Sequence, residues 1–436
     1  MKTWMLAGAA CAALTGLAAP AAAATFPSTP TSSSFASPQV GQAVDGFYAR
    51  RHGATLWLRG GPDSPAATAL IGTLQRAPLD GLASGPALAA QANALLARAR
   101  GGDPAALSNA ERLLATAWVL YVQKLQTPPP AMTFADSWVA PRRDTPAQIL
   151  TRAAAAPSLS SYVHSTAQVN PLYAQLRDAA WAEMQATGGQ LDPRVVGSLQ
   201  RARSMPFQKR YIMVDAASAR LYMIEDDRIV DSMKVVVGKP SAPTPMLAST
   251  IYYATVNPYW HVGDELVRNL IARNVLDQGF GYLKSHGYQV FTSYGDDAEL
   301  IAPDQVDWKA VAAGRQSVEV RQLPGPANSM GDIKFGFPNR YDIYLHDTPN
   351  KDLFAQADRD ISHGCIRLED AGRLGRWMLG HNIGASDQPE KHVLLPTPVP
   401  IYITYLTAHG DDGRLAFVDD VYRRDSAAPA RVAALR

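Results

Sequence analysis

Cysteine is scarce in this chain, which has only Cys11 and Cys365 among its 436 residues. Cys11 lies in an N-terminal stretch with the features of a secretory signal, so we expect a single thiol in the mature protein. A lone thiol in an exported protein has no partner for an internal disulfide, so it is free and reactive or paired between chains. The neighbours of Cys365, which are Gly364 and His363, favour a reactive thiol.

Long apolar runs are also lacking. Residues 4–17 form a short run rich in small residues, and Ala22–Ala24 offers a small-residue cleavage site, which together predict a signal peptide over residues 1–24 with cleavage after Ala24. This interpretation is favoured over a lipid anchor on Cys11, and the run is too short to span a bilayer. No later segment is long and apolar enough for a membrane span, so we expect an exported, soluble chain.

A surplus of charge of either sign is missing. The net charge is +2, and Lys and Arg are spread along the chain, whereas nucleic-acid binding needs a concentrated basic face. The phosphate-binding pattern G-x-x-x-x-G-K-[ST] does not occur either, so no nucleotide cofactor is expected. The apolar fraction of 47% fits a chain with a buried core, and the length allows two or three domains.

The first half of the chain has the periodicity of helices. Residues 25–40 are rich in Ser, Thr and Pro and predict a flexible leader, and residues 41–204 predict a helical domain. A Ser108-x-x-Glu111 capping box precedes an apolar stripe that runs to Leu125. Further helices are predicted near Val44–Arg50, Ala66–Arg76, Ala87–Arg98, Pro146–Ala156 and Leu172–Thr187.

The pattern changes to strands near residue 205, which predicts an α+β chain with a second domain over residues 205–408. Residues 259–320 interrupt the strands and predict an inserted segment, and residues 409–436 are expected to form a C-terminal tail. A helix is predicted over Gly372–Gly380. Strands are predicted at Tyr211–Val214, Arg220–Ile224, Ile229–Val237, Ile251–Val256, Ser317–Arg321, Tyr341–Leu345 and Val399–Leu406.

The second domain holds the residues for thiol catalysis. His346 follows the strand-like run and Cys365 comes later, after a loop long enough to return to the same end of the sheet. A thiol, an imidazole base and backbone amides freed by Gly364 make the layout of acyl transfer. Arg367 is expected either to hold a substrate carboxylate as a fork of donors or to add positive potential at the thiol. The alternatives are a small buried thiol, a structural histidine, and a zinc site that also uses Asp347 and His363. The two-residue spacing of His363 and Cys365 and the lack of a second cysteine disfavour zinc.

Several consecutive blocks of this domain resemble the catalytic domain of bacterial L,D-transpeptidases. The resemblance is to the large periplasmic branch, which carries an N-terminal scaffold and a lid inserted in the catalytic domain. It implies an all-helical scaffold followed by a mixed β-sandwich, with the lid at about residues 259–320. The blocks are Arg321–Asn328, Lys334–Asn339, Ile343–Pro349 and Ser362–Arg367, and they come in the family's order.

The resemblance assigns roles position by position. Cys365 matches the nucleophile and His346 the base that moves its proton. The other matches line the site. Ser362, His363 and Gly364 correspond to the pocket and the oxyanion loop, and Tyr344, Arg367 and Trp260 to substrate-binding positions. No metal and no cofactor are implied.

The implied reaction takes place in the periplasm on peptidoglycan peptide stems. The thiol attacks the L-centre carbonyl of the third residue of a tetrapeptide stem, usually diaminopimelate, and D-alanine leaves. A second diaminopimelate then attacks the thioester to form a crosslink, and carbapenems acylate the same thiol. The resemblance leaves open water as acceptor (a carboxypeptidase), a lipoprotein as acceptor, and a carboxypeptidase partner that supplies the tetrapeptide stems.

Two further points qualify the resemblance. The large branch usually has a small peptidoglycan-binding module in its scaffold, and no segment of this chain matches it. A non-catalytic wall-binding scaffold with the same fold is the third alternative, which the presence of both Cys365 and His346 disfavours.

Overall fold

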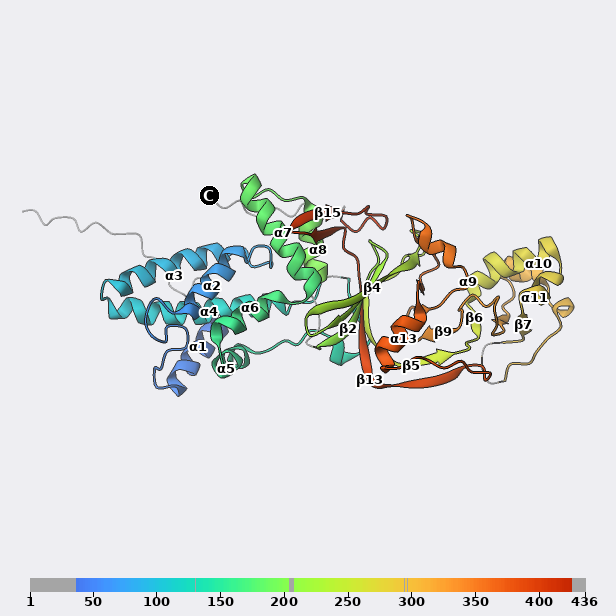
Figure 1. The fold of residues 1–436 in the computed structure, drawn as a ribbon, viewed down its shortest axis with the longest axis horizontal. Coiled ribbons are helices and arrows are strands. Elements are labelled where there is room, and N and C mark those ends of the chain that lie inside the picture. The colour runs from blue at the N-terminus through green and yellow to red at the C-terminus, as the bar shows by residue number, and fades with distance from the viewer. Residues whose placement is uncertain (1–36, 130, 204–207, 294, 296, 426–436) are drawn as a thin grey trace, which may run out of the picture.

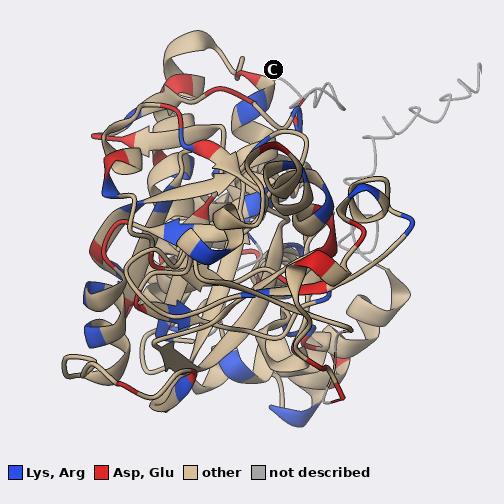
Figure 2. Ribbon diagram, turned by 90° about the vertical axis from the view of Figure 1, so that its right-hand side faces the viewer, with Lys and Arg blue, Asp and Glu red and all other residues tan. Residues whose placement is uncertain are grey.

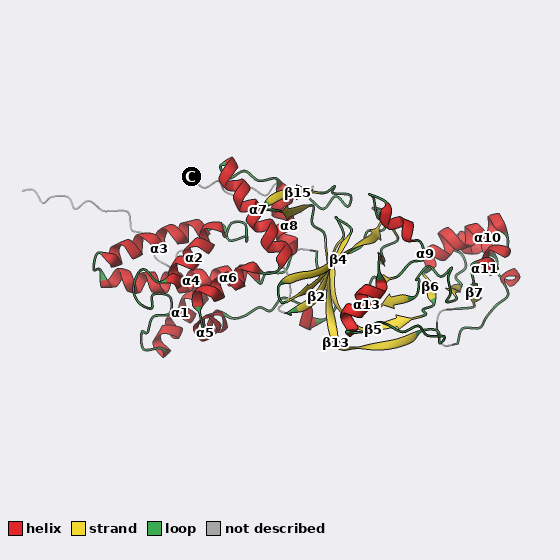
Figure 3. Ribbon diagram, viewed as in Figure 1, coloured by secondary structure: helices red, strands yellow, loops and turns green. Residues whose placement is uncertain are grey.

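The computed structural model describes residues 37–129, 131–203, 208–293, 295 and 297–425. The expected signal peptide and most of the expected leader lie outside these residues. The molecule is elongated, with helices at one end, a β-sheet in the middle and the inserted segment at the far end (Figures 1 and 3). Within the described residues, no helix is both long enough and apolar enough to cross a bilayer.

The helical end confirms every helix that the apolar periodicity predicts, and adds α6, which it does not predict. Proline stands in the first turn of five of the six helices at this end, where its missing N–H and fixed φ cost nothing. The helices are α1 (Pro38–Arg50), α2 (Pro65–Arg76), α3 (Gly85–Arg100), α4 (Pro104–Leu125), α5 (Pro146–Ala155) and α6 (Leu159–Gln168).

The predicted capping box at Ser108 is wrong. Helix α4 begins earlier, at Pro104, and the Asp103 side chain accepts from the Ala106 amide at 3.1 Å as its N-cap. Glu111 instead points into the core, where its carboxylate accepts hydrogen bonds from the Leu56 and Leu58 amides at 2.5 and 2.8 Å. Tertiary contacts of Glu111 thus replace the local cap that the sequence pattern suggests.

Two further helices join the helical end to the sheet. Helices α7 (Pro171–Thr187) and α8 (Pro193–Ala202) pack against a hairpin of β14 (Ala408–Asp411) and β15 (Arg414–Phe417). Residues expected to form a tail are therefore folded as far as Asp425, whose carboxylate pairs with Arg201 at 2.6 Å. The hairpin and the two helices share a buried core.

The mixed sheet closes on itself. Its strands follow the order β5-β13-β2-β3-β4-β12-β10-β9, and β9 pairs again with β5, while the short β1 adds to β5 from the helical half. The enclosed core is aliphatic, with Phe335 and Tyr405 among its members, and α13 packs against it. The elements are β1 (Thr133–Phe134), β2 (Arg210–Asp215), β3 (Arg220–Glu225), β4 (Arg228–Gly238), β5 (Leu247–Val256), β9 (Ile333–Phe335), β10 (Leu345–His346), β11 (Asp360–Ser362), β12 (Ile366–Leu368), α13 (Ala371–Leu379) and β13 (Lys391–Thr404).

The inserted segment has a core of its own, built around Val262, Ile271 and Val320. Its three strands pair antiparallel in the order β6-β8-β7, and its short helices cover them (Figure 1). Tyr344 of the main domain packs against this core, so the lid is anchored beside the candidate site. The elements are β6 (Trp260–Val262), α9 (Asp264–Leu266), α10 (Ala272–Gln278), α11 (Gly281–Ser285), β7 (Tyr288–Phe291), α12 (Trp308–Ala312) and β8 (Glu319–Gln322).

Candidate active site

Strand pairing brings the predicted nucleophile and base to one face of the sheet. Strands β10 and β12 run parallel, with Leu345 opposite Ile366 and His346 opposite Arg367. Cys365 stands directly before β12, two residues before the Arg367 that pairs with His346, and because side chains alternate along an extended chain it is expected on the same face as His346. The opposite face, with Leu345 and Ile366, is buried in the main core.

The strand predicted before His346 is shorter than expected. Only Leu345 and His346 pair, because the Asn339 side chain accepts from the amides of Tyr341 and Ile343 and folds the preceding residues into a turn. Asp342 adopts a φ of 54° in this turn. The turn places the Asp342 carbonyl 3.7 Å from the Cys365 Sγ, where it accepts from the thiol.

The Cys365 thiol is held in its neutral form. Burial raises its pKa to about 11, although hydrogen bonds from the amide and hydroxyl of Tyr344 and the charge of Lys334 pull it down. Desolvation therefore outweighs the groups that favour the thiolate.

His346 is a neutral base with a defined tautomer. Its Nδ1 lies 2.6 Å from the Asp347 carbonyl, so Nδ1 carries the proton and Nε2 is left as the acceptor. Burial, followed by the nearby charge of Arg367, lowers the pKa of His346 to about 3. At neutral pH the site thus holds a thiol and a neutral imidazole, the starting state for general-base activation.

These pKa values predict the pH dependence of thiol alkylation. The folded-state pKa of Cys365 is raised, so the thiolate is scarce below it, about one part in 10⁴ at pH 7. The rate at which iodoacetamide alkylates Cys365, in the chain lacking residues 1–24, should rise about tenfold per pH unit from pH 7 to pH 10. The alkylation rate of glutathione, an ordinary thiol, should level off near pH 9. A plateau below pH 8 would show instead a thiolate stabilised at rest.

The loop before Cys365 is fixed by internal hydrogen bonds. Gly364 has a φ of 115°, and a Cβ there would lie 2.9 Å from the Ile343 Cδ1, so only glycine fits. Its amide donates to the Ser362 Oγ at 3.1 Å, and that hydroxyl donates to the Cys365 carbonyl at 2.7 Å. The Gly364 amide, expected to face an oxyanion, therefore already donates to Ser362. The backbone amide that hydrogen-bonds with the Cys365 thiol is that of Tyr344.

His363 points to a lysine that the sequence reasoning does not single out. Its Nε2 lies 2.9 Å from the Lys239 Nζ, and burial and this cation lower its pKa. Glu265, on α9 of the lid, acts on His363 through its charge. His363 therefore lies where the main domain faces the lid.

Two aromatic side chains connect the lid to the thiol. The Tyr344 hydroxyl hydrogen-bonds with Cys365 and with Trp260, and burial raises the pKa of Tyr344 well above its usual value. The Tyr344 ring also stands edge-on to His346, with 5.7 Å between ring centroids. The structure thus places Tyr344 in contact with Trp260 of β6, with Cys365 and with His346.

Lys334 is the main site residue that the sequence reasoning misses. It lies on β9 opposite His346, and its Nζ is 4.2 Å from the centre of the Tyr344 ring. On β9 it alternates with the buried Ile333 and Phe335, and this alternation is the signal that marks it as facing the site.

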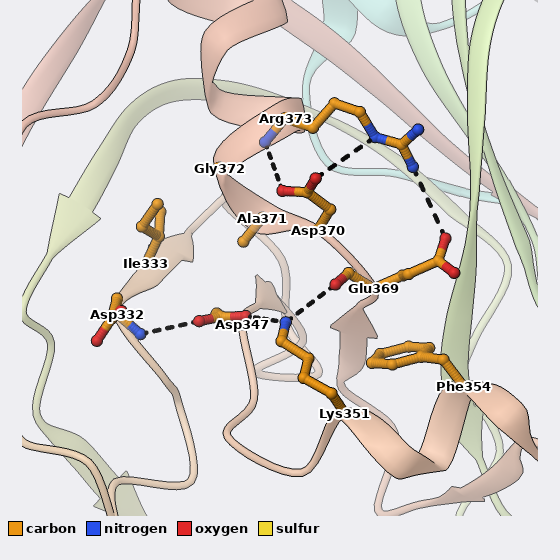
Figure 4. Close-up of a pocket in the computed structure, with 10 residues that line it drawn as sticks. All are labelled: Asp332, Ile333, Asp347, Lys351, Phe354, Glu369, Asp370, Ala371, Gly372 and Arg373. Atoms are coloured by element: carbon orange, nitrogen blue, oxygen red, sulfur yellow. Dashed lines mark hydrogen bonds and ion pairs between the residues drawn. The ribbon is translucent and has the colours of Figure 1, made fainter.

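A second network surrounds Asp347, the residue after His346 (Figure 4). The Lys351 Nζ donates to the Asp347 Oδ1 at 2.6 Å and to the Glu369 carbonyl at 3.0 Å, and the Asp332 amide donates to the Asp347 Oδ2 at 3.2 Å. These contacts tie the ends of β9, β10 and β12 around a hollow of about 740 Å³. They hold the Asp347 backbone, and with it the acceptor for the His346 Nδ1–H.

The zinc alternative finds no matching geometry. In the part of the chain that the structure describes, no three His, Cys, Asp or Glu side chains are grouped to hold a metal ion.

Figure 2 shows Lys and Arg interspersed with Asp and Glu over the end that carries the lid.

Each part of the chain matches a known family model. Residues 209–401 match the model of the L,D-transpeptidase catalytic domain, and residues 42–179 match a scaffold domain. The chain contains an L,D-transpeptidase catalytic domain behind a scaffold domain. Cys365, His346, Tyr344 and Arg367 all lie within this L,D-transpeptidase domain.

Similar proteins carry the same family name. A Haemophilus influenzae protein, named provisionally as an L,D-transpeptidase, is 27% identical over 278 residues, which cover 61% of this chain and 55% of the relative. The chain thus spans about half the length of this curated relative. Among solved structures, the L,D-transpeptidase from Mycobacterium smegmatis shares 13% identity, with a TM-score of 0.23 and coverage of 45% of this chain and 58% of that one. L,D-transpeptidase 3 from Mycobacterium tuberculosis shares 15%, with a TM-score of 0.22 and coverage of 45% and 60%.

Proposed function

We propose that this protein crosslinks peptidoglycan stems in the periplasm, with Cys365 as nucleophile and His346 as base. The observation that carries the proposal is the shared face of β10 and β12. In an L,D-transpeptidase domain, the Cys365 thiol directly precedes β12, two residues before the partner of His346, and the His346 Nδ1–H donates to a backbone carbonyl, which leaves Nε2 as the acceptor.

The first half-reaction forms a thioester. The Cys365 Sγ attacks the L-centre carbonyl of the third residue of a tetrapeptide stem while its proton passes to the His346 Nε2. The tetrahedral intermediate then collapses, the carbon–nitrogen bond breaks, and D-alanine leaves with that proton. The Cys365 thiol and the His346 imidazole are both neutral before the reaction, so negative charge develops only as the thiol attacks. The Tyr344 amide and the cations Lys334 and Arg367 then stabilise this charge.

The second half-reaction transfers the stem to an amine. The amine of an acceptor diaminopimelate attacks the thioester carbon, the carbon–sulfur bond breaks, and the proton that the amine loses passes through His346 to the Cys365 sulfur. Water or the amine of a lipoprotein would use the same thioester, so the acceptor that reaches it decides the product. The buried Tyr344 hydroxyl, which hydrogen-bonds with Cys365 and with Trp260 of the lid, would favour an amine over water by keeping the thioester dry.

A product analysis tests this function. The chain without residues 1–24, incubated with a disaccharide tetrapeptide, should release D-alanine and form a dimeric muropeptide in equal amounts. His346→Gln should lower both by about 10²–10⁴-fold, the usual contribution of a general base.

The other outcomes are informative. D-alanine without dimer would identify a carboxypeptidase or an acceptor not present in the assay. Neither product from a folded, reduced sample would contradict the proposed function and leave a wall-binding scaffold.

A further inference from the structure

An unpaired ammonium group faces the candidate site. In the register of the sheet, Lys334 of β9 pairs with Thr255 of β5 on one side and with His346 of β10 on the other. His346 pairs in turn with Arg367 of β12. In the described part of the chain, no carboxylate lies within ion-pair distance of the Lys334 Nζ, which rests instead against the Tyr344 ring. A half-buried lysine without an anionic partner, next to a reactive thiol, is positioned for an anionic ligand.

A groove lies beside this lysine. It has a volume of about 360 Å³, and Lys334, Tyr344, Asp342, Tyr253 and His392 are among the residues that line it. Asp342 and Tyr344, which line the groove, both hydrogen-bond with Cys365, so the groove lies beside the thiol. The groove therefore has room for an amino acid that reaches the thioester.

We propose that Lys334 binds the α-carboxylate of the D-amino acid whose amine leaves or attacks at Cys365. The inference rests on the proposed function and adds a specificity-determining residue to it. An amine that exchanges its proton with the His346 Nε2 must lie beside that ring, and its own α-carboxylate is one carbon away. Lys334 is the neighbour of His346 on the groove side of the strand pair.

The same contact serves both half-reactions because the two amines are chemically alike. The leaving group is D-alanine, and the acceptor is the D-centre of diaminopimelate, so each is an amine next to an α-carboxylate of D configuration. In the second step the neutral amine forms a carbon–nitrogen bond and the carbon–sulfur bond breaks. One amine proton passes to the His346 Nε2 and from there to the Cys365 sulfur. Lys334 takes no part in these proton transfers.

Arg367 does not fill this role. It lies on the far side of His346, on β12, and does not line the groove. The charge of Lys334 also favours the Cys365 thiolate and lowers the pKa of His346, which places its ammonium group within electrostatic reach of both.

Exchange of the terminal D-alanine with added amino acids tests the proposal. The full chain without residues 1–24 is incubated with disaccharide tetrapeptide and with D-methionine or D-methioninamide, at equal concentrations of unprotonated amine. The ratio of exchange product to hydrolysis product reports the acceptor step alone, since thioester formation cancels. Wild type should favour D-methionine over its amide by at least about tenfold, the value of one charge-assisted contact.

Variants separate the carboxylate contact from a structural effect. Lys334→Met should lower the exchange-to-hydrolysis ratio with D-methionine about 10–100-fold and leave this ratio with D-methioninamide within about threefold, which removes the preference, while Lys334→Arg keeps much of it. Lys284→Met, at an exposed lysine of α11, is the matched control and should match wild type. An unchanged preference in Lys334→Met would overturn the proposal. Absence of any exchange or D-alanine release in wild type would instead overturn the proposed function.

Discussion

Replacing Cys365 with alanine is expected to lower D-alanine release from tetrapeptide stems by at least about 10⁴-fold. Loss of a nucleophile removes the covalent route entirely, and what remains is the small rate supplied by binding and by the surrounding donors. No other residue can substitute, because Cys365 is the one cysteine among the described residues. Steady-state release of D-alanine by wild type and variant, compared at saturating substrate, measures the effect.

The variant also has a built-in stability control. The Cys365 side chain only partly packs against the main core, so its truncation should shift the unfolding midpoint little. A folded Cys365→Ala protein with activity within tenfold of wild type would contradict the assignment of the nucleophile.

Replacing Glu111 with alanine is expected to lower the free energy of unfolding of the helical half by about 3–5 kcal/mol, because several buried donors lose their acceptor. The carboxylate is 4% exposed and accepts from the Tyr48 hydroxyl at 2.5 Å and from three consecutive amides, Leu56, Trp57 and Leu58. Urea unfolding measures the loss, and hydrogen exchange of residues 56–58 should accelerate by at least about 100-fold.

Glu183→Ala is the matched control for this prediction. Glu183 is exposed on α7, and its replacement should change the stability by no more than about 0.5 kcal/mol. If both variants lost the same small amount, the Glu111 carboxylate would have no special structural role.

The sequence predicts the helices and most strands well, since long apolar stripes and β-branched runs leave few other choices. It fails where tertiary contacts override a local pattern. The S-x-x-E signal at Ser108 suggests a helix start, but Asp103 and Pro104 already provide one, and burial of Glu111 is decided by amides more than 50 residues earlier in the chain. The Asn339 turn likewise shortens a run that reads as a strand.

The site is predicted in part for a similar reason. Cys365 and His346 stand out because thiols and imidazoles carry chemistry, and the motifs place them. Lys334 and Lys351 are ordinary lysines in the sequence, and only the pairing of β9 with β10 and the turn after His346 reveal what they contact. The raised thiol pKa follows from burial, which neighbouring residue types do not disclose.

The most direct test of the central claim is the mass of the intact protein after reaction with a carbapenem. Wild type and Cys365→Ala, both without residues 1–24, are reduced, incubated with the antibiotic and measured side by side, and the modified peptide is then sequenced. The account predicts one adduct on wild type, located on Cys365, and none on the variant. An unmodified wild-type protein, or an adduct of equal yield on both proteins, would contradict it.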